Sequence, residues 1–220
     1  MKNIDVPIFT VDFEGSKEVG VVEYGIVEIS RGKISATHTA MSAPKHRRNK
    51  EARTVLDISG ISESQLENLG EFDSNISIFK DMRRRGLFAA HNAAFEDSIL
   101  RSYLPSPGEV PHFIEPGKRV YTWGLWLDSM CFVKNLYPSL ESVKLSDAIN
   151  ALGIKGKLDA LAEIHCPRNR RKWHCALYDA LASAVIFTEV CAQPGFEDMT
   201  LEWLSRYSGN SGLEQKELGL

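Results

Sequence analysis

Acidic side chains in three distant segments are the residues of this chain best suited to chemistry. FTVDFEG carries Asp12 and Glu14, HNAAFED carries Glu96 and Asp97, and HCALYDA carries Asp179. Like charges brought together by a fold repel one another unless a cation lies between them, and hard divalent cations take oxygen ligands. We therefore expect a pocket that binds divalent metal ions and activates water, which is the chemistry of phosphodiester cleavage.

The first acidic pair lies on a predicted strand. Side chains alternate along a strand, so Asp12 and Glu14 share one face while Val11 and Phe13 point to the other. An acidic pair with this spacing is also typical of an exposed strand end with solvated charges. The pair therefore indicates a metal site only in combination with the other two segments.

The second segment lies where a strand is expected to turn into a helix. Asn92 is a typical residue at a helix start, and the backbone N–H groups beside it are suited to meet a phosphate. A plain helix cap followed by a buried Phe95 is the alternative, but it leaves His91 and the two acids unexplained. Glu96 and Asp97 differ by about 100° around a helix, so only one of them is expected to face the site.

A histidine accompanies the acid of the third segment. His174 precedes Asp179 by five residues, near the start of a long predicted helix. An unperturbed histidine pKa near 6.5 suits a general base at neutral pH. A histidine that is buried in the core or caps the helix is the alternative.

Basic residues crowd the loop just before His174, namely Arg168, Arg170, Arg171 and Lys172. Cations there are placed to hold the phosphates of a nucleic acid with salt-dependent affinity, although a solvated run of surface charge would look the same. The two His–Cys pairs at 165–166 and 174–175 also raise the idea of a zinc site. It is disfavoured because adjacent residues seldom both bind one tetrahedral ion and no C-x-x-C spacing is present.

In this order and with these separations, the segments DFE, HNAAFED and HCALYDA resemble the DEDDh branch of the DnaQ-like 3′–5′ exonuclease superfamily. The resemblance covers roughly 7–191. The sister DEDDy branch has a tyrosine four residues before the last aspartate, where this chain has Cys175. The resemblance implies an α/β fold of the ribonuclease H-like type, with a mixed sheet flanked by helices. It also implies hydrolysis of nucleic-acid 3′ ends to nucleoside 5′-monophosphates.

The resemblance further implies roles for individual residues. Two divalent ions, Mg²⁺ or Mn²⁺, would be held by Asp12, Glu14, Glu96 and Asp179, with Asp12 bridging them and His174 as the general base. The slot for the terminal nucleotide would be lined by Phe13, Gly15, His91, Asn92 and Phe95. The basic loop would add Arg171 and Lys172 as phosphate contacts.

The second motif departs from the family pattern. The family usually has aspartate directly after the phenylalanine, where this chain has Glu96 followed by Asp97. Glutamate keeps the charge and adds one methylene, so we expect Glu96 to bind the second metal from slightly farther back, with Asp97 as the less favoured candidate. The alternative to a working nuclease is a catalytically weakened nucleic-acid-binding or replisome-binding module that keeps the exonuclease fold.

Strand and helix patterns predict the frame that positions these motifs. Three short runs over 7–15, 20–30 and 32–42 read as consecutive antiparallel strands. A helix that ends at Gly86, a strand over 87–90 and a helix over 93–104 are expected next, the last with Phe95, Ile99 and Leu100 on one face. A proline-rich loop over 105–124 follows. Two more helices are expected, one within 140–154 and a long one over 175–190. This order favours an α/β layer with a mixed sheet.

Size and composition are consistent with one exonuclease domain over 1–207 and a flexible tail over 208–220. In the tail, Gln215, Leu218 and Leu220 loosely resemble the peptides by which bacterial replication and repair proteins bind the sliding clamp, although an unstructured end is the alternative.

Apolar runs of membrane length and a signal pattern are lacking, and the four cysteines have no disulfide-framework spacing. We therefore expect a cytoplasmic protein with no membrane contact. The net charge of −3 is too mild to argue for or against a polyanionic partner.

Overall fold

A five-stranded mixed sheet forms the centre of the fold in the computed structural model, which describes residues 1, 4–46, 50–196 and 199–209. The strand order is β3-β2-β1-β4-β7, and the strands are β1 (Ile8–Ser16), β2 (Gly20–Ser30), β3 (Lys33–Met41), β4 (Leu87–Ala90) and β7 (Trp126–Asp128). Strands β1, β2 and β3 pair antiparallel, whereas β4 runs parallel to β1 and β7 runs parallel to β4. The predicted mixed sheet is confirmed.

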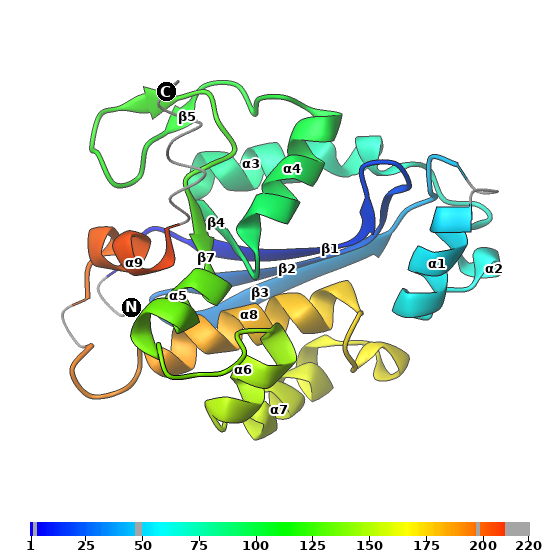
Figure 1. Cartoon of the computed structure of the whole chain (residues 1–220). Helices are drawn as coiled ribbons and strands as arrows, with labels where there is room; N and C mark the ends of the chain where they lie inside the picture. The colour runs from blue at the N-terminus through cyan, green and yellow to red at the C-terminus, as the bar shows by residue number, and fades with distance from the viewer. Residues whose placement is uncertain (2–3, 47–49, 197–198, 210–220) are drawn as a thin grey trace.

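Helices cover both faces of the sheet (Figure 1). Helices α3 (Ile76–Arg85) and α4 (Ala93–Tyr103) lie on one face. The other face carries α5 (Ser129–Leu136), α6 (Leu145–Ala151), α7 (Lys155–His165) and α8 (Ala176–Val190). Helices α1 (Lys50–Ser59) and α2 (Glu63–Leu66) lie beyond one end of the sheet, and α9 (Leu201–Ser208) lies near the other end. The sheet therefore separates two apolar cores, one under α8 and one under α3 and α4.

Helix α8 packs directly on the strands of the sheet. All its residues except Glu189 are buried. Gly25 of β2 permits the close approach, because a Cβ atom at this position would lie 2.3 Å from the backbone nitrogen of Leu177. Farther along the helix, Thr10 Oγ1 of β1 donates to the carbonyl oxygen of Ala180 at 2.9 Å. Since Gly25 pairs with Asp12, these contacts place the start of α8 over the strand that carries the first acidic pair.

Most of the predicted elements are confirmed by the structure. The first three strands, the strand over 87–90 and the long helix over 175–190 lie within a residue or two of their predicted bounds. The predicted helix ends at Gly86 as expected and is preceded by a 3-10 turn (Phe72–Asn75). The proline-rich loop contains a small hairpin of β5 (Val110–Pro111) and β6 (Arg119–Val120). Strand β7 and helices α1, α5, α7 and α9 were not predicted from the sequence.

The three apolar residues expected on one face of α4 differ in their burial. Ile99 and Leu100 are buried under α4, but Phe95 is 37% exposed. Phe95 lies in the first turn of α4 and is absent from the buried residues of this helix. This exposure leaves the Phe95 ring accessible to a ligand.

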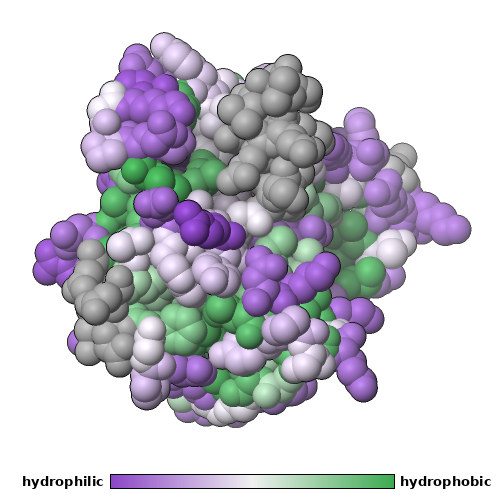
Figure 2. All heavy atoms as spheres, turned by 60° about the vertical axis from the view of Figure 1, so that its left-hand side comes forward, coloured by the Kyte–Doolittle hydropathy of each residue, from purple (hydrophilic) through white to green (hydrophobic). Residues whose placement is uncertain are grey.

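Within the described ranges, no helix is long and apolar enough to cross a membrane. On the side where α9 lies, polar and apolar residues are mixed over the surface and do not separate into two halves (Figure 2).

The close approach of α8 to β2 leads to a prediction about stability. We expect Gly25→Ala to lower the free energy of unfolding by about 2–3 kcal/mol, because the added methyl group would overlap the backbone of α8. Urea unfolding followed by circular dichroism measures this. Gly156→Ala is the matched control, since Gly156 lies in α7 with no atom within 4 Å of the added methyl group, and should be neutral or stabilising by about 0.5 kcal/mol. Equal effects of the two substitutions would contradict the role assigned to Gly25.

Candidate active site

Four predicted acids meet at the end of the sheet near α1. Asp12 and Glu14 lie on the same face of β1, Glu96 lies in the first turn of α4, and Asp179 lies in the first turn of α8. Burial raises the pKa of Asp12 well above its ordinary value, and the charges of the other three acids raise it further. Segments far apart in the sequence thus bring their carboxylates around Asp12.

His174 joins this acid cluster. Ligand atoms of Glu14, His174 and Asp179 all lie within 4.8 Å of one another. The backbone of His174 is left-handed, with φ at 61°, and its N–H donates to Asp179 Oδ2 at 2.9 Å. The His174 side chain is exposed. The loop before α8 therefore turns back on the helix and brings the histidine to the acids.

The acid cluster has the donor set and the electrostatics of a divalent-cation site. Glu96 Oε2 and Asp179 Oδ1 are buried, and neither has a hydrogen-bond partner in the part of the chain that the structure describes. Burial and the charge of Glu14 raise the pKa of Asp179 to about 8, and burial also raises the pKa of Glu96. Buried carboxylate oxygens without partners are costly unless a cation binds them. The residues present thus fit hard divalent ions, which take oxygen ligands.

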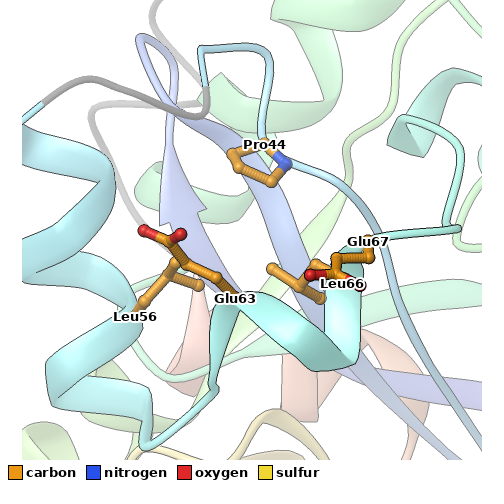
Figure 3. Close-up of a pocket in the computed structure, with 5 residues that line it drawn as sticks. All are labelled: Pro44, Leu56, Glu63, Leu66 and Glu67. Atoms are coloured by element: carbon orange, nitrogen blue, oxygen red, sulfur yellow. The ribbon is translucent and has the colours of Figure 1, made fainter.

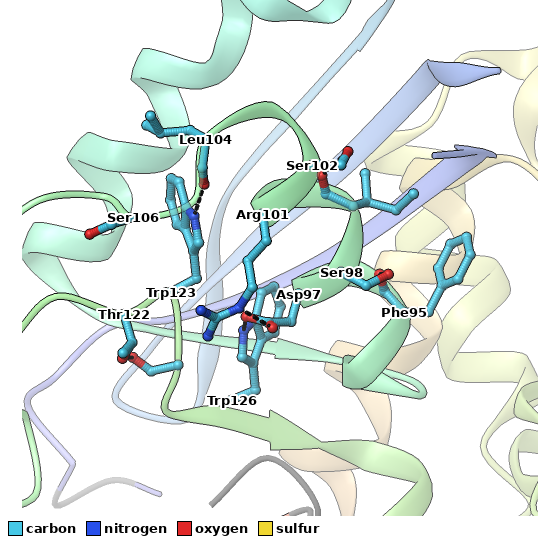
Figure 4. Close-up of polar contacts among 12 residues, drawn as sticks. Phe95, Asp97, Ser98, Arg101, Ser102, Leu104, Ser106, Thr122, Trp123 and Trp126 are labelled. Atoms are coloured by element: carbon cyan, nitrogen blue, oxygen red, sulfur yellow. Dashed lines mark hydrogen bonds and ion pairs between the residues drawn. The ribbon is translucent and has the colours of Figure 1, made fainter. Parts of the chain in front are cut away.

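The structure separates Glu96 from Asp97. Asp97 accepts hydrogen bonds from Trp126 Nε1 at 2.9 Å and from Arg101 Nε at 2.5 Å, and these contacts occupy both of its carboxylate oxygens (Figure 4). In the same view, Phe95 points away from this group of contacts. The carboxylate of Asp97 therefore ties α4 to β7, while Glu96 is the acid of this segment that faces the cluster.

One further charged residue next to the acids, Glu23, was missed from the sequence, and Arg170 of the basic loop, which was expected to hold phosphates, is bonded to it instead. Glu23 lies on β2 directly opposite Glu14, and Arg170 lies in the loop before α8. They form an ion pair in which both residues are at most 5% exposed. A signal was present, because Glu23 interrupts the apolar run VVEYGIV. An acid inside a strand that is otherwise apolar needs a partner.

The fold and this geometry can be compared with known proteins. A sequence model of the Exonuclease family matches residues 10–187, which is most of the chain. The chain belongs to the exonuclease family. Together with its sheet order, this makes the exonuclease a member of the DnaQ-like superfamily with a ribonuclease H-like fold.

Three solved structures share the fold of the exonuclease. Exonuclease X in complex with 5′-overhanging duplex DNA has a TM-score of 0.64 and 18% identity, over 92% of this chain and 99% of the other. Exonuclease I of E. coli with a dT13 oligonucleotide has a TM-score of 0.60 and 13% identity, over 85% of this chain and 41% of the other. A 3′-exonuclease that recognises the histone mRNA stem-loop has a TM-score of 0.58 and 15% identity, over 86% and 82%. No match to a curated protein sequence was found.

Several residues predicted to line a nucleotide slot have other partners in the exonuclease. The ring of Phe13 is buried against Phe72 and Phe79, on the face of β1 opposite Asp12. Both ring nitrogens of His91 are hydrogen-bonded, Nδ1 to Ser129 Oγ and Nε2 to the carbonyl oxygen of Val143. The side chains of Phe13 and His91 thus stabilise the frame around the site.

The expected phosphate contact at the start of α4 is already occupied. The backbone N–H groups of Asn92 and Ala93 donate to the carboxylate of Asp128, which also accepts from Met130 and Cys131 at the start of α5. Asn92 itself is exposed, with φ at 74°. The prediction that these N–H groups are free for a phosphate is therefore wrong.

The remaining predicted residues divide between the site and the frame. Arg171 donates to the carbonyl oxygens of Cys166 and Glu163 at the end of α7, so its guanidinium stabilises that helix end. Lys172 is exposed, and its Nζ lies beside Gly60 at the end of α1. Gly15 forms a bulge in β1 after Glu14. The peptide with Gln215, Leu218 and Leu220 lies outside the described residues, so its docking to a clamp stays a prediction.

A separate pocket lies between α1 and α2 and contains none of the predicted site residues. It has a volume of about 190 Å³ and is lined by Pro44, Leu56, Glu63, Leu66 and Glu67 (Figure 3). Among the described residues, one group of at least three acidic, histidine or cysteine side chains is close enough to hold a metal ion, namely Glu14, His174 and Asp179.

The raised pKa values predict how pH acts on the metal-free exonuclease. Unfolded carboxyls lose their protons near pH 4, whereas Asp179 in the fold holds its proton up to about pH 8. The folded state then binds more protons, so its stability falls as pH rises from about 4 to about 8. In EDTA, we expect Tm to be several degrees lower at about pH 8.5 than at about pH 6, since about 1 kcal/mol shifts Tm by about 2–4 °C at this size.

Added cation tests the same cluster. At about pH 8.5, Mn²⁺ or Mg²⁺ should restore most of the lost Tm, and Asp12→Asn should raise Tm in EDTA while abolishing the response to the cation. Asp97→Asn is the control, because it should leave the cation response in place. A cation response that survives Asp12→Asn would contradict the assignment of this cluster.

Proposed function

We propose that this chain is a metal-dependent 3′–5′ exonuclease of the DEDDh type. It would hydrolyse single-stranded or frayed nucleic-acid 3′ ends to nucleoside 5′-monophosphates. The observation that supports this best is the gathering of the carboxylates of Glu14, Glu96 and Asp179 around Asp12, beside His174. Buried oxygens on Glu96 and Asp179 lack partners among the described residues. Such a cluster is unstable without cations and is suited to hold them.

The four acids would hold two divalent ions, Mg²⁺ or Mn²⁺. Asp12, on which the charges of the other three acids act, would help to hold both ions, together with Glu14, Glu96 and Asp179. When bound, the ions supply positive charge to the attacking and leaving oxygens of the phosphodiester. Ser59 Oγ donates to Glu14 Oε2 at 2.9 Å, which leaves Oε1 of Glu14 for a ligand.

His174 is the group in this site suited to accept the proton of the attacking water. Its side chain is exposed and close to both Glu14 and Asp179, so it can reach a water held at the acids and pass the proton on to solvent. The bond from its N–H to Asp179 fixes the loop at the point where the histidine leaves it.

Two exposed side chains beside the acids are suited to bind the 3′ end. The ring of Phe95 can stack on an unpaired base without sequence preference, since every base offers a flat face. Lys172 lies across the site at Gly60, where an ammonium group can bind a phosphate. The solved structures of similar fold are complexes with DNA in two cases and a protein that recognises RNA in the third, which supports nucleic acid as the substrate class.

Removal of the central acid tests the activity. We expect the wild-type chain with Mn²⁺ to shorten a 5′-labelled single strand stepwise from its 3′ end and to release 5′-monophosphates. Asp12→Asn and His174→Ala should each lower kcat by about 10³-fold, because they remove metal binding and the general base. A gel assay with chromatography of the products measures this. Binding of the strand without any cleavage by the wild type would instead favour the alternative, a nucleic-acid-binding module that keeps the fold.

The second motif gives a sharper test within one helix turn. Glu96→Gln should lower kcat by about 10²-fold or more, because it removes a charge that the metal site needs. Asp97→Asn should instead lower Tm while leaving kcat of the folded protein within about threefold, since Asp97 bonds to Arg101 and Trp126. If Asp97→Asn were the more damaging change to kcat, the assignment of Glu96 would be wrong.

A further inference from the structure

An additional acid lies beside the four acids of the site. Glu23 on β2 is directly opposite Glu14 on β1 in an antiparallel pair and is 3% exposed. Like charges in directly opposed positions destabilise a sheet unless one of them is neutralised. Glu23 is therefore expected to bind either a cation or a basic side chain.

Arg170 meets this need with its whole guanidinium fork. Its Nε donates to Glu23 Oε1 at 3.1 Å, and its Nη2 donates to Glu23 Oε2. Its Nη1 donates to the carbonyl oxygen of Ser59 at 2.6 Å. A planar fork that binds a carboxylate through two parallel bonds fixes geometry as well as charge. Arg170 thereby joins the loop before α8 to β2 and to the end of α1.

The same contacts continue to the acids and to the histidine loop. Glu23 Oε2 also accepts from the backbone nitrogen of Ala176 at 2.9 Å, which is the first residue of α8. Ser59 donates through its hydroxyl group to Glu14. The loop over 170–176, which contains His174, is thus bonded at both ends to Glu23, and one more bond links it to the partner of Glu14.

A pocket of about 210 Å³ lies beside the ion pair, with Glu23, Pro167, Arg170 and Leu177 in its lining. Side chains next to a pocket have room to shift, since they lack contacts on that side. Elsewhere in the loop, Trp173 packs against Tyr178 and Cys175 is buried in the core. The hydrogen bonds of Glu23 and Arg170 therefore restrain the loop on the side where it is not packed.

We propose that Glu23 and Arg170 are a pair of positioning residues, which hold the loop of His174 in register with the strand of Glu14 and so align the general base with the metal site. This inference rests on the proposed function. In this role neither residue contacts the substrate, because both carboxylate oxygens of Glu23 already accept hydrogen bonds from Arg170 and Ala176. The pair acts through the backbone of the loop and through Ser59.

Variants of the pair separate positioning from simple charge balance. Arg170→Met should lower Tm and lower kcat by about 10²-fold, with KM changed by less than about threefold, because a misplaced base slows the chemical step. The double variant Glu23→Leu with Arg170→Met should regain most of the lost Tm, since apolar replacement of a buried ion pair is often neutral or stabilising. Its kcat should stay low. Recovery of both Tm and kcat in the double variant would overturn the proposal.

Arg83→Met is the matched control. Arg83 is equally buried, and its guanidinium donates to the carbonyl oxygens of Trp123, Gly124 and Pro111, at the far end of β4 from the acids. This variant should have a lower Tm, while the kcat of the folded protein stays within about threefold of wild type. A loss of kcat equal to that of Arg170→Met would show that the effect is general destabilisation and would overturn the proposal.

A readout that needs no activity distinguishes failure of this inference from failure of the proposed function. Hydrogen exchange in the peptide that spans 171–178 should be faster in Arg170→Met and in the double variant, by about tenfold, and unchanged in Arg83→Met. Unchanged exchange in the pair variants would overturn the positioning role, whatever the activity. Faster exchange together with an inactive wild type would instead leave the positioning of the loop standing and contradict the nuclease assignment.

Discussion

Repulsion among carboxylates confined to one partly buried pocket is the constraint on which the rest of this structure depends. The fold brings Asp12, Glu14, Glu96 and Asp179 together and leaves two of their buried oxygens without hydrogen-bond partners among the described residues. Only a rigid frame can hold side chains in such a costly arrangement. The close contact of α8 with β2 and the two separate cores on either side of the sheet provide that frame.

The same constraint distinguishes the acids of the site from the acids around it. Asp97 is bonded to Arg101 and Trp126, Asp128 caps α5 and accepts from the start of α4, and Glu23 is paired with Arg170. Each of these acids has its charge compensated by the protein and stabilises the frame. Among the described residues, the acids at the centre are less well compensated, since Glu96 Oε2 and Asp179 Oδ1 have no hydrogen-bond partner, and these acids are the ones suited to cations. The hydrogen-bond and ion-pair partners of an acid in this region thus indicate whether it is suited to bind a metal ion or stabilises the fold.

Much of this could be predicted from the sequence, because the strongest signals are local. Alternating apolar residues predicted the first three strands, and the order of the three motifs predicted the fold and the acids that meet. What the sequence did not reveal depends on tertiary contacts. Examples are the exposure of Phe95, the hydrogen bond from the backbone N–H of Asn92 to Asp128, and the ion pair of Glu23 with Arg170. Each depends on how different elements pack together. Periodicity within one segment carries no information about such partners.

The bond from Thr10 to Ala180 joins the first strand of the sheet to the last helix of the site, across almost the whole chain. Contacts of such long sequence separation form late, because a long loop must close before they are made. During synthesis the chain emerges from its N-terminus, so β1 with its two acids is exposed well before α8 exists. The acid cluster is therefore assembled only when nearly all of the domain has been made. A partly synthesised chain would have no working nuclease site while it is still attached to the ribosome and close to messenger RNA.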